Sequence, residues 1–314
     1  MKYGFGIDLG GTTVKIAYFN EAGKMLEKWE IPTDTSENGI RILPDIAASV
    51  RAFLTERKIA DSDILGLGIG VPGPVNAKGV VNRCINLGWD VFNIAQKLTE
   101  LTGFPVKAGN DANVAALGEF WKGGGQGCDN MVFVTLGTGV GGGIIANGQL
   151  VRGVHFTAGE YSFVNTNADE WENTGKTMAC QCSTTTLLQW YRARRGLPAD
   201  APMNGRQFFD AANAGEPEAL EVLERFCKMV AVQIYNLTVL LDVEKVAIGG
   251  GISKQPILVE TLNEVYEEYI LRGHPFSEAQ ARCLPRPEIV PCRFLSEANQ
   301  IGAFASYQKA FLEN

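Results

Sequence analysis

Two glycine-rich turns carry the side chains with the clearest chemistry. The stretch "DLGGTTVK" places Asp8, Gly10–Thr13 and Lys15 between two apolar runs that are predicted to be strands. The stretch "TLGTGVGGG" repeats this arrangement around Gly137–Gly139. Glycine allows positive φ and close approach to the main chain, so such turns expose backbone N–H groups and hydroxyls that suit a phosphate group. Taken alone, the first stretch is equally consistent with a plain hairpin.

A carboxylate follows the strand predicted within "FPVKAGND". Asp111 stands directly after this strand, and α/β sheets place ligand-binding groups at the carboxyl ends of their strands. A carboxylate there could accept the proton of a hydroxyl group, which is what phosphoryl transfer to an alcohol requires. The alternative is that Asp111 is the N-cap of a helix predicted over Asn113–Trp121, because aspartate is favoured at that position.

These side chains require a repeated α/β framework to position them. The segments "GIDLGGTTVKIAYF" and "VTLGTGVGGGIIA" each contain a strand, Leu-Gly, Thr and a returning apolar strand, which is an internal repeat of one supersecondary unit. The repeat predicts two related α/β domains whose glycine turns face each other. We expect a small domain over residues 1–118 and a larger one over 119–297, with a last helix, 298–314, that packs back on the first.

The pattern of apolar residues also predicts the main helices. A helix is expected around Gly39–Arg57, bent at Pro44, and long amphipathic helices over Pro217–Leu241 and Pro256–Leu271. The segment from Asp169 to Pro202 is polar and is expected to be irregular.

Composition excludes several classes of protein. The 314 residues are 46% hydrophobic, which is enough for sizeable cores, and the net charge of -7 argues against binding to nucleic acid or to anionic membranes. No apolar run reaches the roughly 18 residues of a spanning helix. The first strand begins at the N-terminus, so we expect no signal peptide. Seven scattered cysteines indicate reduced thiols and a cytoplasmic protein.

Six motifs, in the same order along the chain, resemble those of the sugar kinases of the ROK family (repressor, open reading frame, kinase). Within that family they most resemble the motifs of bacterial glucokinases. They are "DLGGTTVK", "GIGVPGPV" with "NLGW", "GNDANVAALGE", "TLGTGVGGGII", "AGE" at 158–160 and "IGGGIS". The resemblance covers nearly the whole chain. It implies two duplicated ribonuclease H-like domains, the fold of actin, hexokinase and the Hsp70 ATPase, with a cleft between them.

The resemblance also implies a role for each motif. Asp111 would be the catalytic base, and Asp8 would hold Mg²⁺ through water, because Mg²⁺ keeps much of its hydration shell. Lys15 could offset phosphate charge or be a solvated strand lysine. The residues implied in sugar binding are Gly73, Asn86, Asn110, Asp111 and Glu160. Those implied in ATP binding, besides Asp8 and Lys15, are Gly10, Gly11, Thr12, Thr13, Gly137, Thr138, Gly139, Gly249, Gly250 and Gly251.

One motif departs from the family pattern. The family continues Gly-Glu-Ile-Gly-His, with a histidine that binds sugar and a structural Zn²⁺, whereas this chain has "GEYSF" with Phe163 at that place. In one register of the cysteine motif that follows, Cys180 and Cys182 match and Gln189 replaces its glutamate. In the other, which Ser183 and Thr184 favour, no zinc cysteine survives and Ala179 replaces the glutamate. Two thiolates are too few for structural zinc, which takes four ligands. We therefore expect no structural zinc, and whether His155 reaches the sugar stays open.

The activity implied is transfer of phosphate from ATP to the 6-hydroxyl of a hexose, with glucose first and a β-glucoside, fructose, allose or N-acetylmannosamine as alternatives. A homodimer is implied by the resemblance alone. A transcription repressor of the same family would need a helix-turn-helix ahead of the first strand, where this sequence has none. A sugar-binding protein without catalysis is the third class, and the intact Asp8, Asp111 and glycine turns argue against it.

Overall fold

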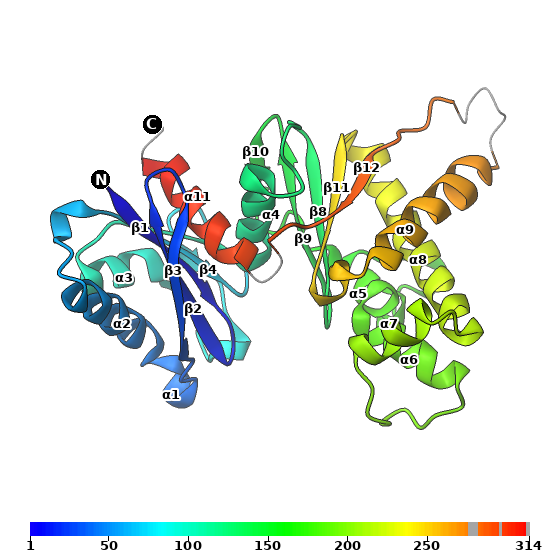
Figure 1. Cartoon of the computed structure of the whole chain (residues 1–314), viewed down its shortest axis with the longest axis horizontal. Coiled ribbons are helices and arrows are strands. Elements are labelled where there is room, and N and C mark those ends of the chain that lie inside the picture. The colour runs from blue at the N-terminus through cyan, green and yellow to red at the C-terminus, as the bar shows by residue number, and fades with distance from the viewer. Residues whose placement is uncertain (276–281, 295–296, 312–314) are drawn as a thin grey trace. The chain divides into compact units, whose positions relative to one another are not determined.

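The structure, a computed structural model, describes residues 1–275, 282–294 and 297–311. The chain divides into two compact units (Figure 1). Unit 1 consists of Met1–Gly123, Arg152–Ala158 and Glu297–Asn314, and unit 2 of Gly124–Val151 and Gly159–Ser296. The domain limits expected from the sequence, 1–118 with 298–314 and 119–297, stay a prediction.

Unit 1 is built on a five-stranded mixed sheet with the strand order β3-β2-β1-β4-β7. The first three strands are antiparallel neighbours joined by tight turns, and β4 and β7 continue the sheet in parallel with β1. The strands are β1 (Tyr3–Leu9), β2 (Thr13–Asn20), β3 (Met25–Pro32), β4 (Ile64–Val71) and β7 (Val106–Asn110), and a small ribbon pairs β5 (Val80–Val81) with β6 (Phe92–Asn93).

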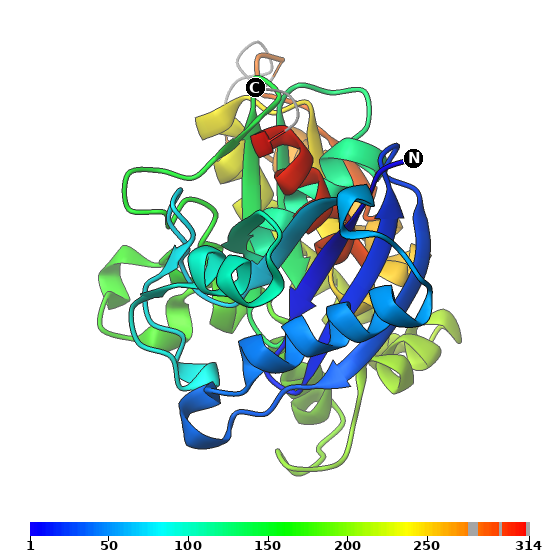
Figure 2. The same ribbon diagram turned by 90° about the vertical axis from the view of Figure 1, so that its left-hand side faces the viewer.

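Helices cover both faces of this sheet. Figure 2 shows α2 (Ile42–Glu56) and α3 (Ile94–Thr102) lying over one face, and their apolar residues form one core with Phe5, Ile7 and Leu67. On the other face α4 (Asp111–Lys122) packs against α11 (Ala298–Phe311). The remaining turns of unit 1 are α1 (Ser36–Gly39) and the 3₁₀ turns Asp61–Asp63 and Ile85–Leu87.

Glycines in the central strands allow α11 to approach the sheet closely. A Cβ atom on Gly6 would lie 2.0 Å from the carbonyl oxygen of Gln300, and one on Gly68 would lie 1.8 Å from that of Ala303. Only glycine leaves room for a helix backbone at this distance. The high glycine content of β1 and β4 therefore seats the last helix, and α11 in turn carries residues toward the end of β1.

We expect the substitution Gly68→Ala to lower the thermal unfolding midpoint of the protein clearly. The added methyl would overlap the main chain of α11, and overpacking of this kind typically costs about 1–3 kcal/mol. The matched control is Gly11→Ala, because nothing lies within 4 Å of a Cβ atom built there. Differential scanning calorimetry of both variants would check this. Equal midpoints for Gly68→Ala and the wild type would contradict the packing described here.

Unit 2 repeats the sheet of unit 1, with the strand order β10-β9-β8-β11-β12. Here too, three antiparallel strands are extended by two parallel ones. They are β8 (Met131–Leu136), β9 (Val140–Ala146), β10 (Gln149–Val151), β11 (Lys245–Gly249) and β12 (Glu288–Pro291). The internal repeat predicted from the sequence is confirmed by these two matching sheets.

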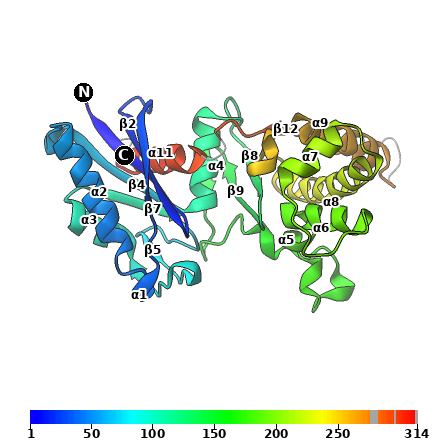
Figure 3. The ribbon, with the colours of Figure 1, turned by 60° about the horizontal axis from the view of Figure 1, so that its bottom comes forward.

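Helices gather on unit 2 after its first three strands (Figure 3). The long α8 (Pro217–Leu241) packs against its neighbours around a core that includes Phe208, Phe226 and Ile234. The others are α5 (Met178–Cys182), α6 (Thr184–Arg194), α7 (Gly205–Asn213) and α9 (Pro256–Val265), which continues into a π-helical turn, Tyr266–Arg272. Short 3₁₀ turns cover Tyr161–Phe163, Ala168–Glu170, Thr174–Lys176 and Gly251–Lys254.

Several predicted element limits need correction. The helix expected from Gly39 to Arg57 begins at Ile42, and Pro44 lies in its first turn, where a missing N–H costs no hydrogen bond. The helix expected from Asn113 begins at Asp111. The strand β12 was not predicted, and the segment from Asp169 to Pro202, expected to be irregular, contains the helices α5 and α6. Among the helices described, none combines the length and the apolar character needed to cross a membrane.

Candidate active site

Three parallel strands of unit 1 end at one edge of the sheet and bring predicted site residues together. Asp8 near the end of β1 is the register partner of Gly70 on β4, and Gly70 is the partner of Gly109 on β7. Asp111 follows two residues after Gly109, and its Cα lies 3.6 Å from a Cβ atom built on Gly70. The two aspartates singled out from the sequence therefore stand at the same edge of the sheet, Asp8 on β1 and Asp111 directly after β7, with β4 between these strands.

Asp8 is a largely buried carboxylate with two partners. Asn299 of α11 donates to its Oδ1 through Nδ2 at 2.8 Å, and Nζ of Lys15 lies 3.8 Å from its Oδ2. Burial raises the pKa of Asp8, an effect that the hydrogen bond from Asn299 and the charge of Lys15 oppose in part. Lys15, its register partner across the hairpin, is thus paired with Asp8 and not simply solvated. Its contact with phosphate stays a prediction.

The first glycine turn is closed by its own backbone and supported from β3. The N–H of Gly10 donates to the carbonyl of Thr13 at 3.1 Å. Thr33, just after β3, donates through Oγ1 to the carbonyl of Gly10 at 2.8 Å and through its N–H to that of Thr12 at 3.0 Å. Gly11 and Thr12 are exposed at the tip, which leaves their N–H groups and the Thr12 hydroxyl accessible to a phosphate.

Asp111 is not the N-cap of the helix that it opens. Asn110 is the N-cap of α4, because its side-chain oxygen accepts the N–H of Asn113 at 3.0 Å. The carboxylate of Asp111 accepts the neighbouring N–H of Ala112 at 2.7 Å and lies at the positive end of the helix, which stabilises its negative charge. The capping alternative for Asp111 is therefore wrong by one residue, and its role as a base stays a prediction.

Asn110 has a structural task besides the predicted one. Its oxygen accepts from both the N–H and the Nδ2 of Asn113, and its own Nδ2 donates to the carbonyl of Gly73 at 3.2 Å. This contact connects the start of α4 to the loop after β4. In that loop Gly73 has a φ of 92°. One Nδ2 hydrogen is what the side chain could offer to a sugar.

Asn86 lies on the 3₁₀ turn Ile85–Leu87, in which Ile85 and Asn86 are exposed and Leu87 is buried. Its loop is held by Cys84 and Trp89, whose N–H and carbonyl groups pair in both directions at 3.0 Å. Burial, together with the charge of Asp111, raises the pKa of the Cys84 thiol, so this loop lies within electrostatic reach of Asp111. Asn86 itself is exposed, and its contact with the sugar stays a prediction.

A cavity of about 760 Å³ borders this loop. Trp89, Ile40 and Phe92 line it, and Trp89 donates to the carbonyl of Gly39 at 3.3 Å. Asp111 and Asn86 do not line this cavity. Its lining includes Gly88, Trp89 and Asp90, which follow the turn that carries Asn86.

In unit 2 the second glycine turn is held from two sides. Its Gly137 carbonyl accepts the N–H of Thr184 at 2.8 Å, and its Thr138 carbonyl accepts the hydroxyl of Thr185 at 3.2 Å. Gly250, with a φ of 92°, lies so close that a Cβ atom there would be 2.2 Å from the carbonyl of Leu136. The structure thus brings the predicted turn Gly137–Gly139 and the predicted loop Gly249–Gly251 together.

Glu160 belongs to unit 2 and precedes the 3₁₀ turn Tyr161–Phe163. Burial raises the pKa of its carboxyl. Gly159 before it has a φ of 88° and lies against the backbone of β9, so the chain direction at Glu160 is fixed. Phe163, at the place where the family has a histidine, is 79% exposed.

The donor groups fit the two implied metals differently. Mg²⁺ is commonly bound by one or two carboxylates together with substrate phosphates, and Asp8, held in place by Asn299, fits that use. Structural zinc needs four ligands, whereas Cys182 is fully buried, with its pKa raised to about 12 by burial, and Cys180 is exposed. Among the residues that the structure describes, no cluster of three or more His, Cys, Asp or Glu side chains could hold a metal ion.

Sequence reasoning missed the residues that support these groups. Asn299, Thr33, Ser162, Thr184 and Thr185 all hold a predicted site residue or turn. The run of threonines at 184–186 before an apolar segment was a visible sign of a helix start. Nothing in the sequence near Asn299 points to Asp8, because 291 residues separate them.

The two units have matching sheets, each with a glycine turn after its first strand, and an aspartate follows a strand end. These features define the class of ribonuclease H-like phosphotransferases. Comparison with known proteins agrees. The ROK family model matches residues 4–310. The chain is 35% identical over 288 residues to a glucokinase of Halalkalibacterium halodurans, covering 85% of this chain and 86% of that protein. It is 32% identical over 273 residues to a beta-glucoside kinase of Listeria monocytogenes, with 84% and 88% covered.

A solved structure matches the whole architecture. The ROK family glucokinase from Streptomyces griseus, in complex with glucose and AMPPNP, aligns with a TM-score of 0.74 at 25% identity and covers 96% of this chain and 97% of that one. The chain belongs to the ROK family, and it is a sugar kinase, an ATP-dependent phosphotransferase. The family and the fold class predicted from the sequence are confirmed.

Proposed function

We propose that this protein transfers the γ-phosphoryl group of ATP to the 6-hydroxyl of a hexose, and that the hexose is glucose. The observation that carries the proposal is the placement of Asp111 at the first position of α4, on the same sheet edge as Asp8. One carboxylate is available to receive a proton and the other to hold a cation beside phosphate.

The chemistry assigned to Asp111 is general base catalysis. Its carboxylate takes the proton of the 6-hydroxyl as that oxygen forms a bond to the γ-phosphorus of ATP, and the bond from phosphorus to the bridging oxygen breaks to release ADP. Asn86, the free Nδ2 hydrogen of Asn110, the loop at Gly73 and Glu160 would orient the sugar. Hydroxyl groups held this way are placed for in-line attack.

The two glycine turns would bind the phosphates. Gly10–Thr13 in unit 1 and Gly137–Gly139 in unit 2 each present backbone N–H groups and a hydroxyl, and Gly249–Gly251 would receive the adenosine. Mg²⁺ held through water by Asp8 would neutralise phosphate charge when bound. Lys15 would add a positive charge at the same place.

The proposal that the sugar is glucose is supported by the 35% identity to a glucokinase. A coupled assay of ADP release with a panel of glucose, fructose, allose, N-acetylmannosamine and an aryl β-glucoside tests it. Glucose should give the highest kcat/KM. If none of these sugars supports the release of ADP, the result would favour a sugar-binding protein without catalysis.

Phosphorylation of a β-glucoside is the second candidate, and Phe163 is the observation that favours it. Its ring is 79% exposed at the place where the resemblance puts a histidine near carbon 1 of the sugar. A ring cannot hydrogen-bond a hydroxyl there, but it can pack against an apolar aglycone. The 32% identity to a beta-glucoside kinase agrees with this alternative.

We expect weak selection at carbons 1 and 2 of the sugar. A site that hydrogen-bonds a hydroxyl rejects analogues that lack it, because its own polar groups are left unpaired. With Phe163 in place of the histidine, 2-deoxyglucose, mannose or a 1-substituted glucoside should therefore react at a rate comparable to glucose. Values of kcat/KM for this panel test the idea. A preference for glucose over all of them by more than a thousandfold, roughly 4 kcal/mol, would refute it.

Cellular context completes the proposal. We place the protein in the cytoplasm, where ATP and reduced thiols are available, as a homodimer that binds neither nucleic acid nor membranes. The acidic net charge of -7 supports the last two points, and size-exclusion chromatography with light scattering tests the dimer.

A further inference from the structure

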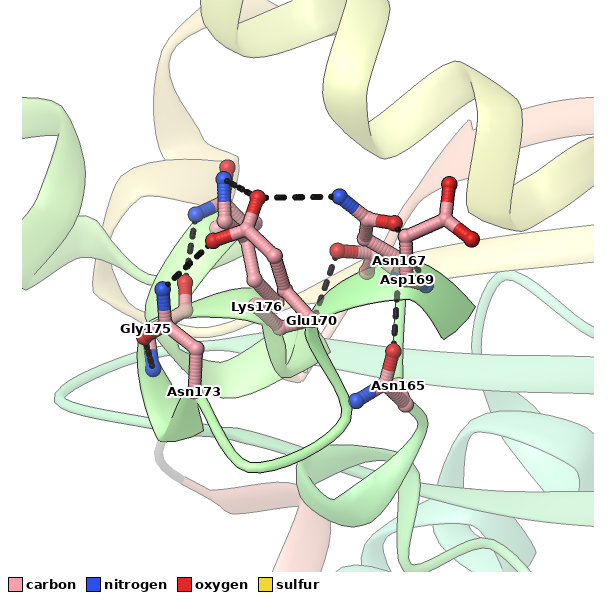
Figure 4. A network of polar contacts seen from close by, with 9 residues as sticks. Asn165, Asn167, Asp169, Glu170, Asn173, Gly175 and Lys176 are labelled. Carbon is pink, nitrogen blue, oxygen red and sulfur yellow. Dashed lines mark hydrogen bonds and ion pairs between the residues drawn. The ribbon is translucent and has the colours of Figure 1, made fainter.

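A ring of hydrogen bonds closes the segment that follows Glu160, and Glu170 lies at its centre (Figure 4). Its Oε1 accepts from Nδ2 of Asn167 at 3.1 Å and lies 3.0 Å from Nζ of Lys176, and its Oε2 accepts from Nδ2 of Asn173 at 2.9 Å. These two hydrogen bonds and the ion pair therefore come from three residues of one loop. Hydrogen bonds to an ionised carboxylate are roughly twice as strong as neutral ones.

The backbone closes the same loop at its ends. The N–H of Met178 donates to the carbonyl of Val164 at 2.7 Å, and the N–H and hydroxyl of Thr166 both donate to the carbonyl of Lys176, at 2.7 and 2.6 Å. Residues 164–178 thus form a closed structure, which we call the clasp. The clasp occupies the stretch between Phe163 and Cys180 where the family resemblance implies a zinc site.

The chain on each side of the clasp contacts one flank of the second glycine turn, through Ser162 before it and, beyond α5, through Thr184 after it. Before the clasp, the hydroxyl of Ser162 donates to the carbonyl of Val140 at 2.6 Å and accepts the N–H of Val140 at 3.3 Å. After the clasp, Thr184 donates through N to the carbonyl of Gly137 at 2.8 Å and through Oγ1 to that of Leu136 at 3.0 Å. The turn Gly137–Gly139 is therefore held between two anchors that the clasp connects.

We propose that Glu170 closes the clasp without a metal ion, and that the clasp positions the glycine turn Gly137–Gly139. Glu170 is a positioning residue in this account, since it acts through Ser162 and Thr184. The effect on catalysis rests on the proposed function, in which this turn binds ATP phosphate. The closure of the clasp itself does not depend on that assignment.

The substitution Glu170→Gln tests the proposal, because it keeps one side-chain oxygen but removes the charge and one acceptor. Amide hydrogen exchange followed by mass spectrometry, without ligands, should rise in residues 164–178 and in 136–140. The KM for ATP should increase about three- to tenfold while kcat changes less, as expected when binding of the nucleotide is weakened. Metal analysis of the wild type purified without chelator should give no stoichiometric zinc.

Asp169→Asn is the matched control. Asp169 is the neighbouring carboxylate of the same loop, and in Figure 4 it points away from Glu170, with only its backbone N–H bonded, to Asn167 at 3.0 Å. It should match the wild type in exchange and in KM. If Glu170→Gln raises exchange but leaves the KM for ATP unchanged, the clasp stands and the phosphate role of the turn fails. Unchanged exchange in Glu170→Gln, or one tightly held zinc per chain, overturns the proposal.

Discussion

The substitution Asp111→Asn should reduce kcat by roughly 10²–10⁴-fold or more, the usual contribution of a general base. The amide cannot accept the proton of the sugar hydroxyl. The fold should tolerate the change, because an asparagine oxygen can still accept the N–H of Ala112, and the capping task belongs to Asn110. Affinity for the preferred hexose, measured by calorimetric titration, should stay close to that of the wild type.

Asp45→Asn provides the control for Asp111→Asn. Asp45 also lies in the first turn of a helix of unit 1, α2, where it forms an exposed ion pair with Arg41 at 2.9 Å. An exposed pair contributes little to stability, and Asp45 is far in sequence from every predicted motif, so this variant should keep full activity. Activity of Asp111→Asn within tenfold of the wild type would show that another group receives the proton.

The fold was predictable because its signals are local and repeated. Two strand–glycine–strand segments reveal the duplication, since each hairpin is encoded by residues close in sequence. The limits of elements were less predictable. One helix was expected to begin at Asn113 but begins at Asp111, with Asn110 as its N-cap. Its start was hard to predict because Asn110, Asp111 and Asn113 are all residue types able to cap a helix.

The chemistry of the site was predictable from residue types, but its support was not. Asp8, Asp111 and the glycine turns occur in recognisable patterns along the chain. Asn299 donates a hydrogen bond to Asp8, from which 291 residues separate it. Thr184, at the start of α6, donates its N–H to the carbonyl of Gly137 in the glycine turn. Such contacts exist only after the sheet has brought distant segments together. A single sequence contains no periodic or compositional mark for them.

The same limit applies to the polar segment between Phe163 and Cys180. Its asparagines and acidic residues look like a solvated loop in the sequence, and each has a common use in turns. Only the structure shows that Asn167, Asn173 and Lys176 converge on Glu170. The sequence led us to expect no structural zinc there, but it did not predict the hydrogen bonds to Glu170.

The substitution Asp8→Asn should reduce kcat/KM by about 10²–10³-fold, as is typical when one electrostatic group that stabilises the transition state is removed. The same change should make the ligand-free protein at neutral pH as stable as the wild type or more stable. Burial raises the pKa of Asp8 above its usual 3.8, which means that the folded protein disfavours the charged form. Asparagine removes that charge, and its oxygen can still accept from Asn299.

The pH dependence of stability separates this explanation from a general loss of packing. A group whose pKa is raised by folding costs no stability below its unfolded pKa, and its ionisation destabilises the fold as pH rises through the folded value. The unfolding midpoints of Asp8→Asn and the wild type should therefore converge near pH 3.8 and separate toward neutral pH, with the variant higher. Thermal unfolding at several pH values, without nucleotide or Mg²⁺, measures this. A midpoint for Asp8→Asn several degrees below the wild type at pH 7 would mean that Asp8 stabilises the fold, and that its pairing with Lys15 and Asn299 outweighs the cost of burial.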